Sequence, residues 1–334
     1  MQAVTYTAFG PASDVLQLQE IDSPTPGPGE VRVDLVYSGV NPSDVKARAG
    51  ARAGVTDLPY PLIIPHSDGA GVISAVGDGV ATGRVGQRVW IWNGQWQRAF
   101  GTAAQQITLP ADQAVPLPDN TSMATGASLG IPGLTACFAV FNGGDVAGQT
   151  VLVQGGAGTV GYLAVQLAKW GGARVIATAR GDGLDRVRVA GADVALDYAA
   201  PDLAARILAA NDGAPVDQIV EVEFGMNAAT NAEVIAENGR ITAYGSAKNM
   251  TPVLPFYPLM FKAVTLKVAL VYILTPSQRK ETEQRLDAAL RAGALDCPVD
   301  QVFDLADCAA AHRAVEAGGR SGSILVRTGD DPGA

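Results

Sequence analysis

The pattern of apolar and polar positions changes near residue 120. Before it, apolar residues occur in short runs, several of them alternating, that end at glycine or proline turns. Such runs predict strands. The clearest are "VRVDLVYSGV" (31–40), "GAGVISAVG" (69–77) and "GQRVWIW" (86–92). This half of the chain is therefore predicted to form a small, irregular β-barrel domain.

After residue 120, short apolar runs alternate with helix-length segments, a pattern that implies a parallel sheet covered on both faces. The expected strands are "VLVQG" (151–155), "RVIAT" (174–178), "VALDY" (194–198), "QIVEV" (218–222), "RITAYG" (240–245) and "TLKVALVYIL" (265–274). The expected helices are 158–171, 182–190, 200–211 and 226–237. The fold class is thus α/β, with a doubly wound Rossmann sheet.

The end of the chain, "VFDLADCAAAHRAVEAGGRSGSILVRT" (302–328), reads as strand, helix and strand. Its last strand is predicted to complete the N-terminal β domain, which would then be discontinuous. The expected domains are a first domain of 1–122 with 275–334 and a Rossmann domain of 123–274.

The turn "GGAGTVG" (155–161) carries Gly156, Gly158 and Gly161 in the G-x-G-x-x-G spacing. The first glycine permits a tight turn, the second lets the backbone approach a pyrophosphate, and the third lets the helix pack on the strand. The helix N-terminus then offers N–H groups and a positive dipole end to phosphates. Because a strand precedes the turn and a helix follows it, the turn predicts a dinucleotide site.

The strand that follows this turn and helix, 174–178, indicates at its end which dinucleotide binds. An NAD site usually has a carboxylate there, which accepts from the ribose 2′-OH. Here the strand ends "ATAR", and Arg180 is suited to a 2′-phosphate. Asp182 is the rival residue, unless it caps the next helix, and Tyr198 is expected beside the adenine. The cofactor predicted is NADPH.

Composition excludes several classes of function. A net charge of −9 makes nucleic acid an unlikely partner, because an acidic surface repels phosphates. The apolar runs are all shorter than the roughly 18 residues of a membrane span. The three cysteines, Cys137, Cys297 and Cys308, lack metal-type spacing, and a cytoplasmic location is expected.

A dinucleotide domain beside a β-barrel domain resembles the medium-chain dehydrogenase/reductase superfamily, whose first domain is GroES-like. Zinc-dependent members carry "GVCHTD" and "GHEGAG", where this chain has "GVNPSD" (39–44) and "HSDGAG" (66–71). The family's three zinc-ligand positions fall on Asn41, Ser67 and Ile131, and His66 stands where the pattern has glycine. The resemblance therefore predicts that the chain holds no metal.

These substitutions, with "GIPGLTA" (130–136) and "NGRITAYGS" (238–246), resemble the zeta-crystallin-like quinone oxidoreductases. The resemblance implies NADPH-dependent reduction of quinones by a zinc-free homodimer or homotetramer. An enone or enal reductase with the same cofactor remains an alternative, as does a non-catalytic NADPH-binding protein.

Three side chains are candidates for donating a hydrogen bond or a proton to the substrate. Asn41 can donate through its amide, and Lys46 and His66 are donors at positions where this chain departs from the family pattern. The cofactor contacts implied by the resemblance are Asn41, Thr135, Gly156, Ala157, Gly158, Thr159, Val160, Gly161, Arg180, Tyr198, Asn227, Ala243, Tyr244, Gly245, Ser246, Val271, Tyr272 and Ile273.

Overall fold

The computed structural model describes residues 1–52 and 54–331. The chain forms two units: unit 1 comprises residues 1–131 and 297–334, and unit 2 comprises residues 132–296. The first domain is thus discontinuous, but its borders differ from the predicted 122/123 and 274/275. Residues 332–334 of the predicted first domain lie outside the described residues.

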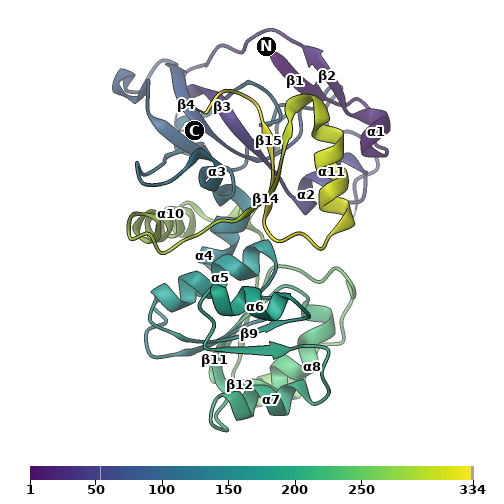
Figure 1. The fold of residues 1–334 in the computed structure, drawn as a ribbon, viewed down its shortest axis with the longest axis vertical. Coiled ribbons are helices and arrows are strands. Elements are labelled where there is room, and N and C mark those ends of the chain that lie inside the picture. Colours follow the sequence, from purple (N-terminus) through teal and green to yellow (C-terminus); the bar gives the residue numbers. More distant parts are fainter. Residues whose placement is uncertain (53, 332–334) are drawn as a thin grey trace. The chain divides into compact units, whose positions relative to one another are not determined.

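Unit 1 is built on a largely antiparallel sheet with the order β14-β15-β3-β4-β5-β7, with β6 also pairing with β3 (Figure 1). The strands of unit 1 are β1 (Gln2–Thr5), β2 (Gln17–Glu20), β3 (Glu30–Val40), β4 (Asp68–Val76), β5 (Arg88–Ile91), β6 (Gln106–Pro110), β7 (Ala114–Pro116), β14 (Val299–Asp304) and β15 (Ser323–Arg327). Of these, β1 and β2 pair with each other in a separate sheet. Its helices are α1 (Ala12–Val15), α2 (Pro42–Arg48), α3 (Met123–Gly126) and α11 (Cys308–Ala317).

The last strand joins unit 1 as the sequence predicts. In β15, Ile324 pairs with Val40 of β3, in an antiparallel ladder. Helix α11 packs against this region through Cys308, Ala311 and Val315, which belong to one apolar core with Val40 and Ile324. The C-terminal segment is therefore part of the core of unit 1.

Unit 2 contains a six-stranded parallel sheet with the order β10-β9-β8-β11-β12-β13. Its strands are β8 (Thr150–Val153), β9 (Arg174–Ala179), β10 (Val194–Asp197), β11 (Val216–Glu221), β12 (Ile235–Ala243) and β13 (Thr265–Val268). The strand order reverses between β8 and β11, which is the doubly wound Rossmann arrangement. The prediction of this fold class is confirmed.

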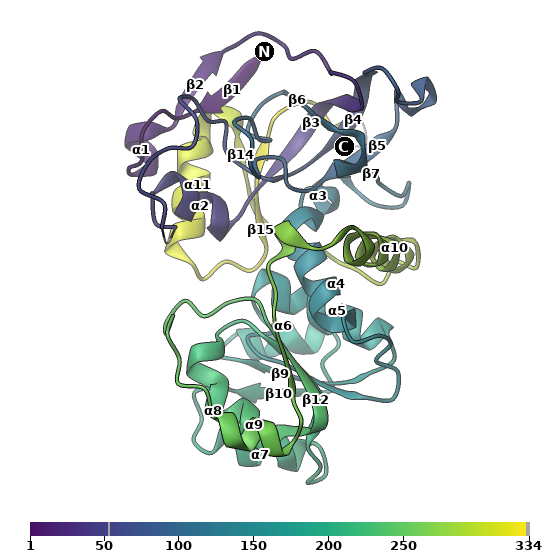
Figure 2. The ribbon, with the colours of Figure 1, turned by 180° about the vertical axis from the view of Figure 1, so that it is seen from behind.

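Helices cover both faces of this sheet. The helices of unit 2 are α4 (Leu134–Phe141), α5 (Thr159–Trp170), α6 (Gly183–Val189), α7 (Leu203–Ala210), α8 (Phe224–Val234), α9 (Phe256–Phe261) and α10 (Pro276–Arg291), the last of which packs on α4. Within unit 2, α5 and α6 lie on one face, and α7, α8 and α9 lie on the other (Figures 1 and 2). Double coverage explains why the strands read as continuous apolar runs.

One predicted strand is shorter than expected. Of "TLKVALVYIL", only Thr265–Val268 pairs with β12, and Val271–Ile273 form a 3₁₀ turn. The ladder ends where Val268 pairs with Ala243, the last residue of β12. A long apolar run thus ends as a strand where its partner strand ends.

Candidate functional site

The glycine turn follows β8 directly and opens α5. Gly155 has φ of +67°, a conformation that favours glycine. A Cβ on Gly161 would lie 2.4 Å from the carbonyl oxygen of Gly155, so the helix packs on the turn only without a side chain. A Cβ on Gly158 would meet only that same oxygen, at 3.5 Å. The turn is therefore closed toward the sheet and open at Gly158, where a backbone can approach a phosphate.

Arg180 and Tyr198 leave the sheet side by side. Asp197 of β10 pairs with Ala179 of β9, and the N–H of Tyr198 donates to the carbonyl of Ala179. Both side chains are exposed, and β9 lies between β10 and β8, which leads into the glycine turn. Asp182 occupies the N-cap position of α6, without a side-chain hydrogen bond to that helix. This edge of unit 2 therefore presents a cation and an aromatic ring together.

Sequence reasoning missed Arg186, which lies on α6. Its Nε donates to the carbonyl of Ala157 in the glycine turn at 2.9 Å, and its guanidinium lies 4.3 Å from the ring centroid of Tyr162. It thus adds positive charge beside the turn. Its position in the sequence, on an exposed helix, gave no signal of this contact.

The loops after β11 and β12 are tied together. The N–H of Gly225 donates to Ser246 Oγ, and the carboxylate of Glu223 accepts from the N–H groups of Ala247 and Lys248. These hydrogen bonds therefore join the two segments that carry the predicted contacts Asn227 and Ala243–Ser246 at the sheet's carboxyl edge.

The remaining predicted contacts of unit 2 lie at helix and turn positions. Val271–Ile273 form the 3₁₀ turn after β13, and the guanidinium of Arg279 donates to the carbonyl of Val271. Thr135 is buried in α4.

Sequence reasoning also missed a group of buried polar side chains at the carboxyl edge of the sheet. They are Gln154, Thr178, Glu221 and Asn231. The available signal was a polar residue at or just beyond the end of several apolar strands, as in "VLVQ", "VIAT" and "IVE".

In unit 1, a buried carboxylate joins two of the three zinc-ligand positions. Asp68 Oδ2 accepts from Asn41 Nδ2 at 2.8 Å and from the N–H of Ile131 at 2.9 Å. Burial raises the pKa of Asp68 well above its usual value. The remaining position, Ser67, is buried. An isoleucine offers no side-chain ligand and the amide nitrogen of Asn41 already donates, so these positions do not fit a catalytic zinc.

The predicted donors Asn41 and Lys46 belong to α2. Asn41 is the N-cap, and its N–H donates to the carboxylate of Asp44 at 2.8 Å. Desolvation raises the pKa of Asp44 to about 7. Lys46 is exposed on the same helix. Asn41 is buried, and one of its amide hydrogens is already committed to Asp68.

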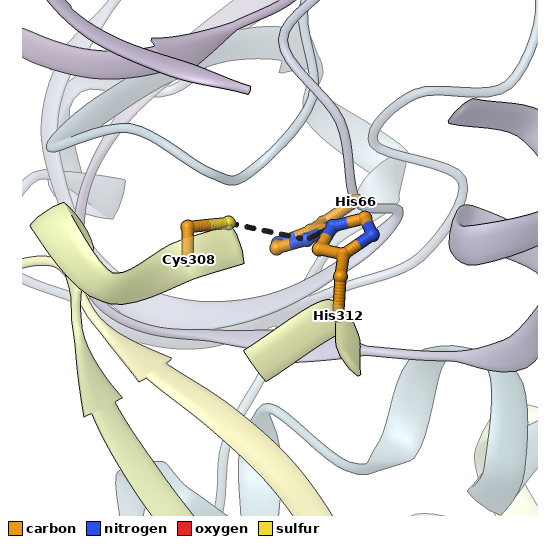
Figure 3. Close-up of side chains that lie close together, drawn as sticks. All are labelled: His66, Cys308 and His312. Carbon is orange, nitrogen blue, oxygen red and sulfur yellow. Dashed lines mark hydrogen bonds between the residues drawn. The ribbon is translucent and has the colours of Figure 1, made fainter. Parts of the chain in front are cut away.

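His66 lies in a buried cluster with Cys308 and His312 (Figure 3). The Nε2 atoms of the two histidines are 2.8 Å apart, and Cys308 Sγ lies 3.8 Å from His66 Nε2. Within 1–52 and 54–331, these three are the one group whose ligand atoms gather as a metal site would need. Two nitrogens on tetrahedral zinc would be about 3.3 Å apart, given Zn–N bonds of about 2.0–2.1 Å. The observed 2.8 Å fits a hydrogen bond instead.

The hydrogen-bond partners fix the direction of this network. Thr102 Oγ1 donates to the carbonyl of Asp68, so it must accept from Ser38 Oγ. Ser38 Oγ must then accept from His66 Nδ1, at 2.8 Å. His66 Nε2 is consequently an acceptor, and His312 Nε2 donates to it. Burial lowers the pKa of both histidines, to about 3 for His312, so both are neutral.

His66 is therefore fully buried, with both ring nitrogens engaged inside unit 1. This geometry does not support its predicted role as a donor to substrate. His66 also has φ of 78°, which explains why the family pattern has glycine at this position. Its ring connects Ser38 of β3 to His312 of α11 through hydrogen bonds.

Comparison with known proteins agrees with both units. The family model described as "Alcohol dehydrogenase GroES-like domain" matches residues 27–119, and "Zinc-binding dehydrogenase" matches residues 159–291. A solved structure described as an NAD-dependent alcohol dehydrogenase is 30% identical with a TM-score of 0.85, over 98% of this chain and 100% of that one. The chain belongs to the medium-chain dehydrogenase/reductase superfamily. The predictions of this superfamily and of an oxidoreductase are confirmed.

Among proteins of this superfamily, the rat quinone oxidoreductase is 28% identical over 98% of this chain and 97% of its own length. A mycobacterial protein solved in complex with NADPH is 28% identical, with a TM-score of 0.83, over 98% of this chain and 100% of that one. No helix within the described residues is both long and apolar enough to span a membrane.

Proposed function

We propose that the chain catalyses the NADPH-dependent, zinc-independent reduction of quinones by hydride transfer. The observation that carries this proposal is the edge of unit 2 where Arg180 follows β9, beside Tyr198 and the open glycine turn. A guanidinium there suits a 2′-phosphate, whereas an NAD site usually has a carboxylate. The similarity to quinone oxidoreductases supports the choice of acceptor.

When bound, the cofactor supplies a hydride from its nicotinamide ring. The open glycine turn binds the pyrophosphate, and the loop of Tyr244, Gly245 and Ser246 borders the nicotinamide half. Thr135, Asn227 and the turn Val271–Ile273 complete the proposed contacts. The protein's share of catalysis is then orientation and exclusion of water.

The donor set in unit 1 supports the proposed zinc independence. A quinone is electron-poor enough to accept hydride without a Lewis acid, and the developing oxyanion needs only hydrogen-bond donors. Asn41 has one amide hydrogen beyond the one given to Asp68, and Lys46 carries an exposed ammonium. We assign these two residues to the acceptor side and a structural role to His66.

The protein is further proposed to be a cytoplasmic homodimer or homotetramer. Its three cysteines are free thiols, which suits a reducing compartment. In unit 2, β13 is the terminal strand of the sheet, and exposed apolar side chains from α9 lie close to it in sequence. An apolar sheet edge of this kind is suited to pairing with a second copy.

A kinetic screen tests the function. Purified protein is assayed with a naphthoquinone and with a simple conjugated ketone, each with NADPH and with NADH, before and after dialysis against a chelator. We expect the naphthoquinone with NADPH to be the best pair, with no loss on chelation. Preference for the conjugated ketone would assign an enone reductase, and loss of activity restored by zinc would overturn zinc independence. NADPH binding without oxidation by either acceptor would indicate a non-catalytic protein.

A further inference from the structure

Glu221, the last residue of β11, is a fully buried carboxylate. Its Oε1 accepts from the N–H of Glu223 and, at 3.0 Å, from Asn227 Nδ2, and its Oε2 accepts from Asn231 Nδ2 at 2.6 Å. All three neighbours are N–H donors, which an ionised carboxylate satisfies as an acceptor. Burial raises the pKa of Glu221, and these three hydrogen bonds oppose that rise.

The network continues to the glycine turn. Gln154 Nε2 donates to Asn231 Oδ1 at 3.1 Å, Thr178 Oγ1 donates to Gln154 Oε1 at 2.7 Å, and the N–H of Gly155 donates to Thr178 Oγ1 at 3.0 Å. The backbone N–H at one end can only donate and the carboxylate at the other can only accept, so every amide in between has one orientation. Each hydrogen bond in this network therefore donates in the direction of Glu221.

The sheet order locates this carboxylate relative to the dinucleotide. A doubly wound sheet binds one nucleotide on each side of the point where strand order reverses. The glycine turn, Arg180 and Tyr198 follow β8, β9 and β10, so the adenosine belongs to that half. The nicotinamide then belongs to the half formed by β11, β12 and β13. Glu221 ends β11, and its partner Asn227 is partly exposed on that half.

We infer that Glu221 is a positioning residue whose buried negative charge favours the oxidised nicotinamide over the reduced one. Hydride transfer removes a proton with two electrons from a neutral ring, which becomes a cation, while the quinone gains the hydride. A fixed negative charge behind Asn227 stabilises that cation and leaves the neutral ring almost unaffected. This inference rests on the proposed function, because it requires the dinucleotide in unit 2.

The variant Glu221→Gln tests the charge with little change of size. The dissociation constants of NADPH, by its fluorescence, and of NADP⁺, by competition, are measured for the wild type and the variant. We expect NADP⁺ to bind about tenfold more weakly and NADPH to change less than about threefold, since charge attraction of this range is on the order of one pKa unit. Equal weakening of both forms would mean that Glu221 only supports the fold, and would overturn the inference.

Two further variants complete the test. Glu221→Asp keeps the charge, so the ratio of the two dissociation constants should return to the wild-type value even if both forms bind more weakly. Glu233→Gln removes an exposed charge from α8 and should change neither constant. If Glu221→Gln does not fold, an altered ratio in Glu221→Asp overturns the inference, because that variant keeps the charge. A wild type that binds neither nucleotide would contradict the proposed function itself.

Discussion

Arg180 is the residue on which the choice of nucleotide depends. It follows Ala179 at the end of β9 and is exposed beside Tyr198, whose N–H is fixed to the same strand end. Asp182, the carboxylate nearest in sequence, stands two residues further on at the start of α6. Relatives differ in the nucleotide that their descriptions name, so this position has to be tested in the chain itself.

Replacing Arg180 with alanine should lower the preference for NADPH. A hydrogen bond to a charged group contributes about 1.5–3 kcal/mol, and solvent screening at an exposed site reduces this toward about 1 kcal/mol. We therefore expect kcat/KM for NADPH to fall about 5- to 30-fold, with kcat/KM for NADH nearly unchanged. The variant Arg174→Ala, which removes a charge from the opposite end of β9, is the matched control. An unchanged NADPH/NADH ratio in Arg180→Ala would assign the 2′-phosphate to another residue.

At the scale of elements, α11 is held to the sheet of unit 1 by neutral histidines. The folded state keeps the pKa of both His66 and His312 below that of a free imidazole, which is about 6.5. The unfolded chain therefore binds more protons below pH 6.5, and the stability from neutral histidines is lost as pH falls from there toward about 3. Arg48 adds to this effect at His312.

The double variant His66→Gly with His312→Leu should remove this dependence. Relative to it, the wild type should lose about 2 kcal/mol per imidazole between pH 7.5 and pH 5, measured by urea unfolding. Asp44 and Asp68, whose raised pKa values give the opposite sign, are present in both proteins and cancel in the difference. Parallel pH profiles would contradict the prediction. The chain has only these two histidines, so their ring protons can also be followed directly, and neither should titrate above pH 5 in the folded wild type.

The sequence predicts those elements that local patterns determine. The spacing of Gly156, Gly158 and Gly161 located the turn between β8 and α5, because the glycine requirement is local. The Glu221 network joins Gln154, Thr178 and Asn231 across three elements, and no spacing within the chain encodes that approach. The predicted length of β13 was wrong because the end of a strand also depends on a distant segment: the ladder ends where its partner β12 ends.

At the scale of the whole molecule, the proposed self-association can be tested at β13, the terminal strand of the sheet in unit 2. In the described chain, β13 pairs with β12 on one side only. Val268 on β13 is 76% exposed, Phe261 on α9 is 78% exposed and Ile273 is 64% exposed. Exposed apolar side chains and an unpaired strand edge are both unfavourable in water, so a second copy of unit 2 is expected to cover them.

Introducing a lysine at Val268 should weaken this association. In a two-fold symmetric contact each substitution appears twice, so two ammonium groups would be brought into one apolar interface. We expect the sedimenting mass of Val268→Lys to fall from that of an oligomer toward that of a single chain at micromolar concentration, while the dissociation constant of NADPH stays within about threefold. The variant Val189→Lys is the matched control, because Val189 is similarly exposed, at 79%, and lies on helix α6 rather than on β13. A wild type that is already monomeric, or a loss of association in both variants alike, would show that the β13 edge is not the interface.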